Sequence, residues 1–193
     1  MRKPEGYDEA VVFNNRRLPI GAYEIQILDA VVREESSLEK LVLRFDISNG
    51  EYKGFFQKDF EQQNKQDSSN ANWKGVFKQL TSGKSVVFFK KLIQTIEASN
   101  SGYKFNFDEN TLKGKKIGMV FDEIKFTSKK TGKPSSFVGA VEAITIADLE
   151  SGNFEIPSKR QSKKNDDSSK SDSSSANNNM VDNKNYDDID IPF

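Results

Sequence analysis

The chain has 193 residues, of which 35% are hydrophobic and 30% charged, and its formal net charge is zero. It contains neither cysteine nor histidine, which excludes disulfides, thiolate and Ser-His nucleophiles and the usual zinc ligand sets. A chain of this length holds one ordinary domain, and so polar a composition predicts that part of it is unstructured.

The sequence offers no membrane-spanning or secretory segment. No apolar run approaches the roughly 20 residues that a spanning helix needs, and residues 1–6 do not lead into the apolar stretch of a signal peptide. We therefore expect a soluble, cytoplasmic protein without a membrane partner.

The zero net charge hides an asymmetry between the two ends of the chain. Residues 166–193 contain seven acidic and two basic residues, so this tail carries a charge of −5 and the remainder carries +5. A basic body with an acidic tail suits the binding of a polyanion that the tail itself avoids. Charge alone favours the simpler interpretation of a solvated surface.

The pattern of apolar residues predicts three strands in the first third of the chain. Residues 23–27 alternate between apolar and polar after an entry turn at 18–21, and residues 41–47 place four apolar side chains on one face. The charged residues 31–39 between them predict a turn. Turn residues at 48–50 then predict a third strand, over residues 52–60, that pairs back on the second.

The middle of the chain predicts helical structure and the last third a hairpin. Residues 61–72 are polar and predict a loop, whereas apolar residues recur at spacings of three and four from Trp73 to Ile96. This spacing predicts two short helices or one helix kinked around residues 81–83. Residues 116–126 and 136–146 predict two strands joined by a basic tip that contains Gly and Pro.

The order strand, strand, strand, helix, strand, strand is that of the oligonucleotide-binding (OB) barrel, a five-stranded Greek-key fold that binds oligomers across its second and third strands. We therefore predict a mainly β protein, an OB-fold-like barrel with a helix between strands 3 and 4 and a disordered C-terminal tail. A plain antiparallel sheet with one helical layer is the competing fold. The predicted boundaries are a binding domain at 1–157, a polar linker at 158–185 and an acidic tip at 186–193.

The tip combines acidic side chains with an apolar end, and its residues predicted to contact a partner are Asp187, Asp188, Asp190, Ile191, Pro192 and Phe193. It resembles the acidic tip of bacterial single-stranded DNA-binding proteins, except that Ile189 stands where that family usually has another acid. The resemblance implies recruitment of host or phage replication and recombination proteins. Physically, one pocket with a cation at its mouth can hold the Phe193 ring and its carboxylate together, while the aspartates steer the encounter.

The body carries a second resemblance, in short segments spread over residues 18–157: LPIGAY at 18–23, FDI at 45–47, GFF at 54–56, WKGVF at 73–77, FFK at 88–90, IEASN at 96–100, DENTLKGK at 108–115 and GNFEIP at 152–157. They resemble a domain of formerly unknown function that is common in phages of Gram-positive bacteria and is presumed to bind single-stranded DNA. The resemblance implies a sequence-independent single-stranded DNA-binding protein of phage DNA replication or recombination, acting in the host bacterial cytoplasm.

Contact residues are predicted from physical chemistry, because binding a single strand needs cations for its phosphates and aromatic faces for its bases. The candidates on the predicted second and third strands are Arg44, Lys53, Phe55, Phe56 and Lys58. On a regular strand at most one of the two phenylalanines stacks on DNA. The predicted hairpin adds Lys125, Lys129, Lys130 and Lys133, and the N-terminal segment adds Arg16 and Arg17. For any one of these residues, packing or solvation is the commoner role.

No motif indicates catalysis or a cofactor. The segment GKS at 83–85 lacks the glycine that a phosphate-binding loop requires five positions earlier, and the acidic pairs at 108–109 and 122–123 have no spaced partners for a metal. We therefore expect a non-enzymatic protein without cofactor or metal, and a carboxylate-dependent nuclease is disfavoured. The alternative function is an adaptor that imitates the host tail and diverts replication enzymes without binding DNA. Homo-oligomerisation is compatible with the sequence.

Overall fold

The computed structural model describes residues 17–35, 37–128 and 131–158. Its elements, in chain order, are β1 (Gly21–Glu35), β2 (Leu38–Ile47), α1 (Phe55–Gln66), β3 (Val76–Leu80), the short 3-10 helix η1 (Gly83–Ser85), α2 (Val86–Ser99), a second 3-10 helix η2 (Glu109–Leu112), β4 (Lys116–Thr127), β5 (Pro134–Ile144) and α3 (Ile146–Ser151). None of the helices in these described ranges is long and apolar enough to span a membrane.

The five strands form one open antiparallel sheet in the order β3-β2-β1-β4-β5. The two edge strands, β3 and β5, contact each other, so the sheet curls toward closure. Helix α2 lies between β3 and β4 in the sequence, as predicted. The predicted mainly β fold is therefore confirmed, and its strand order is compatible with an OB-like barrel.

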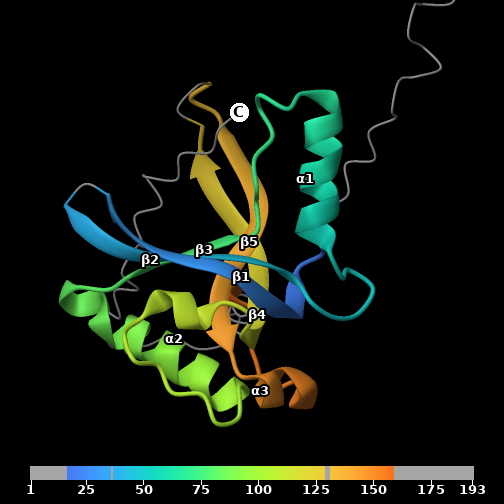
Figure 1. The fold of residues 1–193 in the computed structure, drawn as a ribbon. Coiled ribbons are helices and arrows are strands. Elements are labelled where there is room, and N and C mark those ends of the chain that lie inside the picture. The colour runs from blue at the N-terminus through green and yellow to red at the C-terminus, as the bar shows by residue number, and fades with distance from the viewer. Residues whose placement is uncertain (1–16, 36, 129–130, 159–193) are drawn as a thin grey trace, which may run out of the picture.

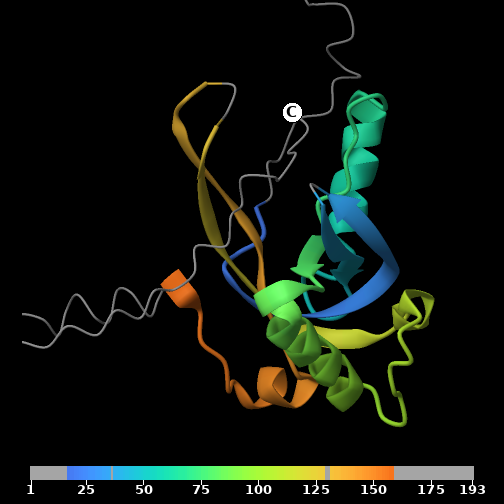
Figure 2. The ribbon, with the colours of Figure 1, turned by 90° about the vertical axis from the view of Figure 1, so that its left-hand side faces the viewer.

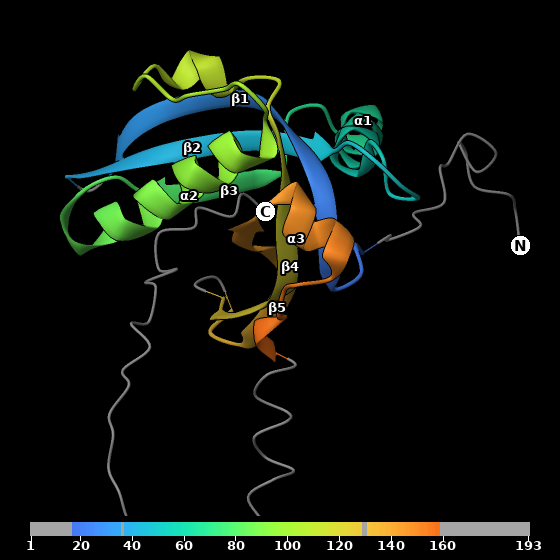
Figure 3. The same cartoon turned by 90° about the horizontal axis from the view of Figure 1, so that it is seen from below.

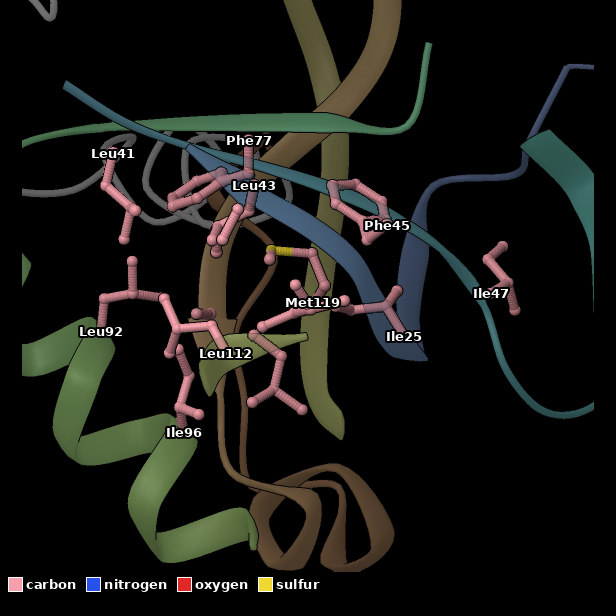
Figure 4. Close-up of a cluster of buried hydrophobic side chains, with 14 of the residues drawn as sticks. Ile25, Leu41, Leu43, Phe45, Ile47, Phe77, Leu92, Ile96, Leu112 and Met119 are labelled. Carbon is pink, nitrogen blue, oxygen red and sulfur yellow. The ribbon is translucent and has the colours of Figure 1, made fainter. Parts of the chain in front are cut away.

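The interior of this sheet is filled by alternate residues of its strands. Ile25, Leu43, Phe45 and Met119 expose 1% of their surface or less, because successive side chains of a strand point to opposite faces. Figure 4 shows Leu92 and Ile96 of α2 directed into the same cluster. Each fully buried side chain of this size contributes about 1.5 to 3 kcal/mol.

Helix α2 is amphipathic and packs on the inner side of the sheet, in contact with β3, β4 and β5. Its buried residues are Leu92 and, one helical turn later, Thr95 and Ile96. Figure 3 shows α2 next to β3, and α3 next to β4. The helix predicted from the spacing of Phe88, Leu92 and Ile96 is confirmed.

The prediction of a third strand over residues 52–60 is wrong, because this segment begins helix α1. Gly54 adopts a left-handed conformation (φ 70°) before the helix, and the carboxylate of Asp46 accepts hydrogen bonds from the backbone N–H groups of Phe56 (3.0 Å) and Gln57 (3.1 Å). A buried carboxylate on strand β2 thus caps the helix, and this long-range contact outweighs the strand preference of the aromatic residues. The predicted loop at 61–72 also contains the last turn and a half of α1.

The actual third strand is β3, where the spacing of Trp73, Phe77 and Leu80 predicts a helix. Phe77 and Gln79 are buried and Lys78 is exposed, which is the alternation of a strand. The predicted turn at 31–39 is also too long, since β1 continues to Glu35 and β2 begins at Leu38. The predicted strands at 116–126 and 136–146 are confirmed with small shifts of their ends.

Removal of the cap on α1 tests its contribution to folding. An Asp46→Ala variant should lose about 2 kcal/mol of unfolding free energy, because it leaves the buried N–H group of Phe56 and the partly buried one of Gln57 without this acceptor. Urea denaturation measures the loss. Asp46→Asn keeps an acceptor oxygen in place and should lose less, so equal stability of the alanine variant and the native chain would contradict the capping role.

Candidate nucleic-acid interface

Strands β1, β2 and β3 turn one face away from the core, and we call it the outer face. Because Leu41, Leu43 and Phe45 point inward, the side chains between them point outward. The strand register places paired outward positions beside each other. The residues of the outer face are Asp29, Val31 and Arg33 of β1, Lys40, Val42 and Arg44 of β2, and Val76, Lys78 and Leu80 of β3.

Two projections rise on the same side as the outer face. Figures 1 and 2 show helix α1 on one side and the β4–β5 hairpin on the other, both extending away from α2. Since α2 packs against the inner side of the sheet, the outer face lies toward the space between these projections. In OB-type barrels the face of strands 2 and 3 and the loops beside it bind oligomers.

A cation and an aromatic ring meet on this face beside α1. The guanidinium carbon of Arg44 lies 5.4 Å from the centre of the Trp73 ring, within the range of a cation–π contact. The indole N–H of Trp73 donates to the backbone carbonyls of Gly75 (3.1 Å) and Phe45 (3.3 Å), and its ring lies 5.8 Å from that of Phe60 on α1. These contacts hold Trp73 in place and spread the Arg44 side chain over a flat surface.

Three lysines on or beside the outer face are paired with acids. Lys74 lies 3.1 Å from a carboxylate oxygen of Asp59 on α1. Lys40 and Lys78 both contact Glu35, at 2.9 and 3.3 Å. The hydrogen bond from Lys40 lowers the pKa of Glu35 below its ordinary value, so this carboxylate is ionised at neutral pH. In contrast, Arg44 is exposed and its contact is with an uncharged ring.

Of the aromatic candidates, Phe56 is part of the core. Only 6% of its surface is exposed, and its ring stacks on that of Phe121 at 6.1 Å. Its assignment as a base-stacking residue therefore fails, because no face of the ring is open. Phe55 is half-buried between Tyr52 and Phe56, and both phenylalanines belong to a helix rather than to the predicted strand.

The cationic candidates fall into separate groups. Arg44 lies on the outer face in register with Asp29 and Val76, at the end of the face that is next to Trp73. Lys53 and Lys58 meet at the start of α1, where the Lys58 ammonium donates to the Lys53 carbonyl at 3.2 Å. Lys125 and Lys133 lie exposed on the β4–β5 hairpin, with Lys125 3.9 Å from Glu123. Arg17 is exposed just before β1.

The remaining predicted site residues lie outside the described ranges, and the structure gives them no position. They are Arg16, Lys129 and Lys130, together with the tip residues Asp187, Asp188, Asp190, Ile191, Pro192 and Phe193. Within the described ranges, no group of three or more acidic side chains gathers as a metal site would require.

Comparison with models of protein families finds no match, and comparison with curated proteins finds none either. The outer face combines an exposed arginine, Arg44, with the fixed indole ring of Trp73 and with nearby lysines.

Sequence reasoning missed Trp73, Lys74, Lys78 and Lys40 as site residues. The sequence carries little signal for them, because residues 76–80 (VFKQL) do not alternate between apolar and polar side chains; the alternation appears only in the structure, where Phe77 and Gln79 are buried and the residues between and beside them face outward. Had this segment been interpreted as a strand, Lys78 would have fallen on the outer face. Trp73, placed just before that strand between polar Asn72 and Lys74, would then have marked its entry.

Proposed function

We propose that the folded domain binds single-stranded DNA without sequence preference across the outer face of β2 and β3. The observation that carries the proposal is the Arg44 guanidinium held over the Trp73 ring at 5.4 Å, on the central strand β2 of a face that also bears Lys40 and Lys78. A planar cation of this kind can contact a phosphate through its edge and a base through its face.

Single strands should be preferred to duplexes for a physical reason. Stacking on a protein aromatic or guanidinium plane requires a base whose own face is free, which duplex DNA does not offer. Each such stack contributes about 1 to 3 kcal/mol. The contacts to phosphate are independent of sequence, so the predicted activity is strand protection rather than sequence recognition.

The acidic tip supplies a second element of the proposal. Residues 186–193 recruit replication or recombination enzymes of a phage or its bacterial host, as the resemblance implies, through the Phe193 ring and its carboxylate. A polar linker keeps a captured enzyme at high effective concentration near the bound strand. The protein then acts as a non-enzymatic organiser of DNA intermediates.

The test is fluorescence anisotropy with labelled oligo(dT) and with the corresponding duplex, for the full chain and for a chain that lacks residues 187–193. Both proteins should prefer the single strand at least about tenfold, and affinity should fall on the order of tenfold between 50 and 200 mM NaCl if three phosphates are contacted. The shortened chain should bind more tightly, because its acidic tip no longer competes with DNA.

Two results would each contradict a part of this proposal. Equal affinity of both chains at low salt would exclude competition by the tip and leave it as a recruitment element. Absence of binding by both chains would overturn the DNA-binding proposal and favour the adaptor function, in which the tip alone acts.

A further inference from the structure

Two lysines from different strands converge on one carboxylate at the end of the outer face. Glu35 is the last residue of β1, Lys40 lies on β2 and Lys78 on β3. The ammonium group of Lys40 donates to Oε2 of Glu35 at 2.9 Å, and that of Lys78 lies 3.3 Å from Oε1 and 3.4 Å from Oε2. Both cations are therefore within hydrogen-bond reach of the same small anion.

Two lysines that share one carboxylate can share one phosphate in the same way. A carboxylate and a phosphodiester each present two anionic oxygens, and lysine binds either as a compact point charge. The side chains of Glu35, Lys40 and Lys78 are 29%, 13% and 35% exposed, so the carboxylate can leave toward solvent without unfolding of the sheet. Ion pairs that are partly open to solvent in this way contribute about 1 kcal/mol each, which contacts with a nucleic acid can replace.

We propose that Lys40 and Lys78 form a phosphate-binding position of the interface, which the carboxylate of Glu35 occupies in the free protein and a DNA phosphate displaces. This inference rests on the proposed function and deepens it. Glu35 then restrains affinity and weakens salt dependence, because the two lysines are already neutralised and release fewer counterions when DNA arrives.

Glu35→Gln in the full chain tests the assignment, with Glu34→Gln as the matched control. Glu34 is the neighbouring residue of β1, is exposed, and points to the opposite face of the strand. Both substitutions remove one negative charge from the same hairpin. They therefore change long-range electrostatics equally and differ only in the contact with Lys40 and Lys78.

Affinity for labelled oligo(dT) is measured by anisotropy over a series of NaCl concentrations. Glu35→Gln should bind about three- to tenfold more tightly than the native chain at low salt, with a slope of log K against log salt that is steeper by about 0.7, which corresponds to one further phosphate contact on a single strand. Glu34→Gln should change affinity less than about twofold. Adding Lys78→Gln to Glu35→Gln should abolish the gain.

The possible outcomes separate this inference from the proposed function. If the native chain and the Glu35→Gln variant bound oligo(dT) with the same affinity and the same salt slope, the proposed phosphate position would be wrong. The proposal of DNA binding would still stand. Equal tightening by Glu34→Gln would also overturn it, since long-range charge would then explain the effect. No binding by any variant would overturn both. Thermal unfolding of each variant establishes that the compared chains are folded.

Discussion

Arg44→Glu is expected to lose affinity for single-stranded DNA on the order of 100-fold at low salt, which corresponds to about 2.7 kcal/mol. The substitution removes the cation from the Trp73 ring and places a negative charge where the phosphate or base is proposed to lie. Stability should fall by only about 1 kcal/mol, because Arg44 is exposed and its contact with the ring is a surface cation–π pair. Anisotropy with oligo(dT) measures the first effect and urea denaturation the second.

Lys90→Glu is the matched control for this experiment. Lys90 is exposed on α2, which lies on the side of the sheet opposite to α1 and the β4–β5 hairpin (Figure 1). The two variants change net charge by the same amount, so only location distinguishes them. Both variants are measured at low salt and again at 150 mM salt, where the Debye length is about 8 Å. At 150 mM salt Lys90→Glu should weaken binding by less than about threefold, and at either concentration by far less than Arg44→Glu. Similar losses for both variants would show that net charge, and no defined face, governs binding.

Gly75→Ala is expected to have the largest effect on stability, a loss of about 3 kcal/mol of unfolding free energy and roughly 10 °C in Tm. A Cβ atom at this position would lie 2.3 Å from the backbone oxygen of Phe45 and 2.9 Å from ring atoms of Phe56. Neither neighbour can withdraw easily, since the Phe45 N–H donates to the Gly75 carbonyl (2.9 Å) and Phe56 is buried in the core. Differential scanning calorimetry measures the change.

Gly21→Ala provides the comparison for that variant. Its Cβ would meet no atom closer than the Tyr23 hydroxyl oxygen at 3.5 Å, which is an ordinary van der Waals contact. Stability should therefore change by no more than about 0.5 kcal/mol. A Gly75→Ala chain as stable as Gly21→Ala would show that the entry into β3 is more pliable than its close contacts indicate.

The parts of the fold that could be predicted are those whose pattern depends on local burial. Strand β2 buries Leu41, Leu43 and Phe45 on one face, and the alternation is visible in the sequence. Helix α2 repeats its buried residues at helical spacing for the same reason. The order of the main elements followed from these segments, even though the third strand was assigned to the wrong residues.

Helix α1 could not be predicted because a distant residue specifies it. Phe55, Phe56 and Phe60 have the composition of a strand, and the hydrogen bonds that begin the helix come from Asp46 on β2. The same error displaced the predicted interface. With residues 52–60 taken as a strand, Phe55 and Phe56 became the candidates for base stacking. Trp73 was placed in a helix, so its contact with Arg44 could not be foreseen.

The cap that Asp46 places on α1 also bears on the rate of the proposed DNA binding. Asp46 follows Arg44 by two residues on β2, and α1 supplies Phe60 to the ring of Trp73. Strand, helix and indole are thereby fixed to one another before any ligand arrives, so little conformational entropy remains to be lost at the Arg44–Trp73 pair on binding. The proposed binding of DNA at this pair should then be limited by diffusion and electrostatic steering rather than by a slow rearrangement of the protein.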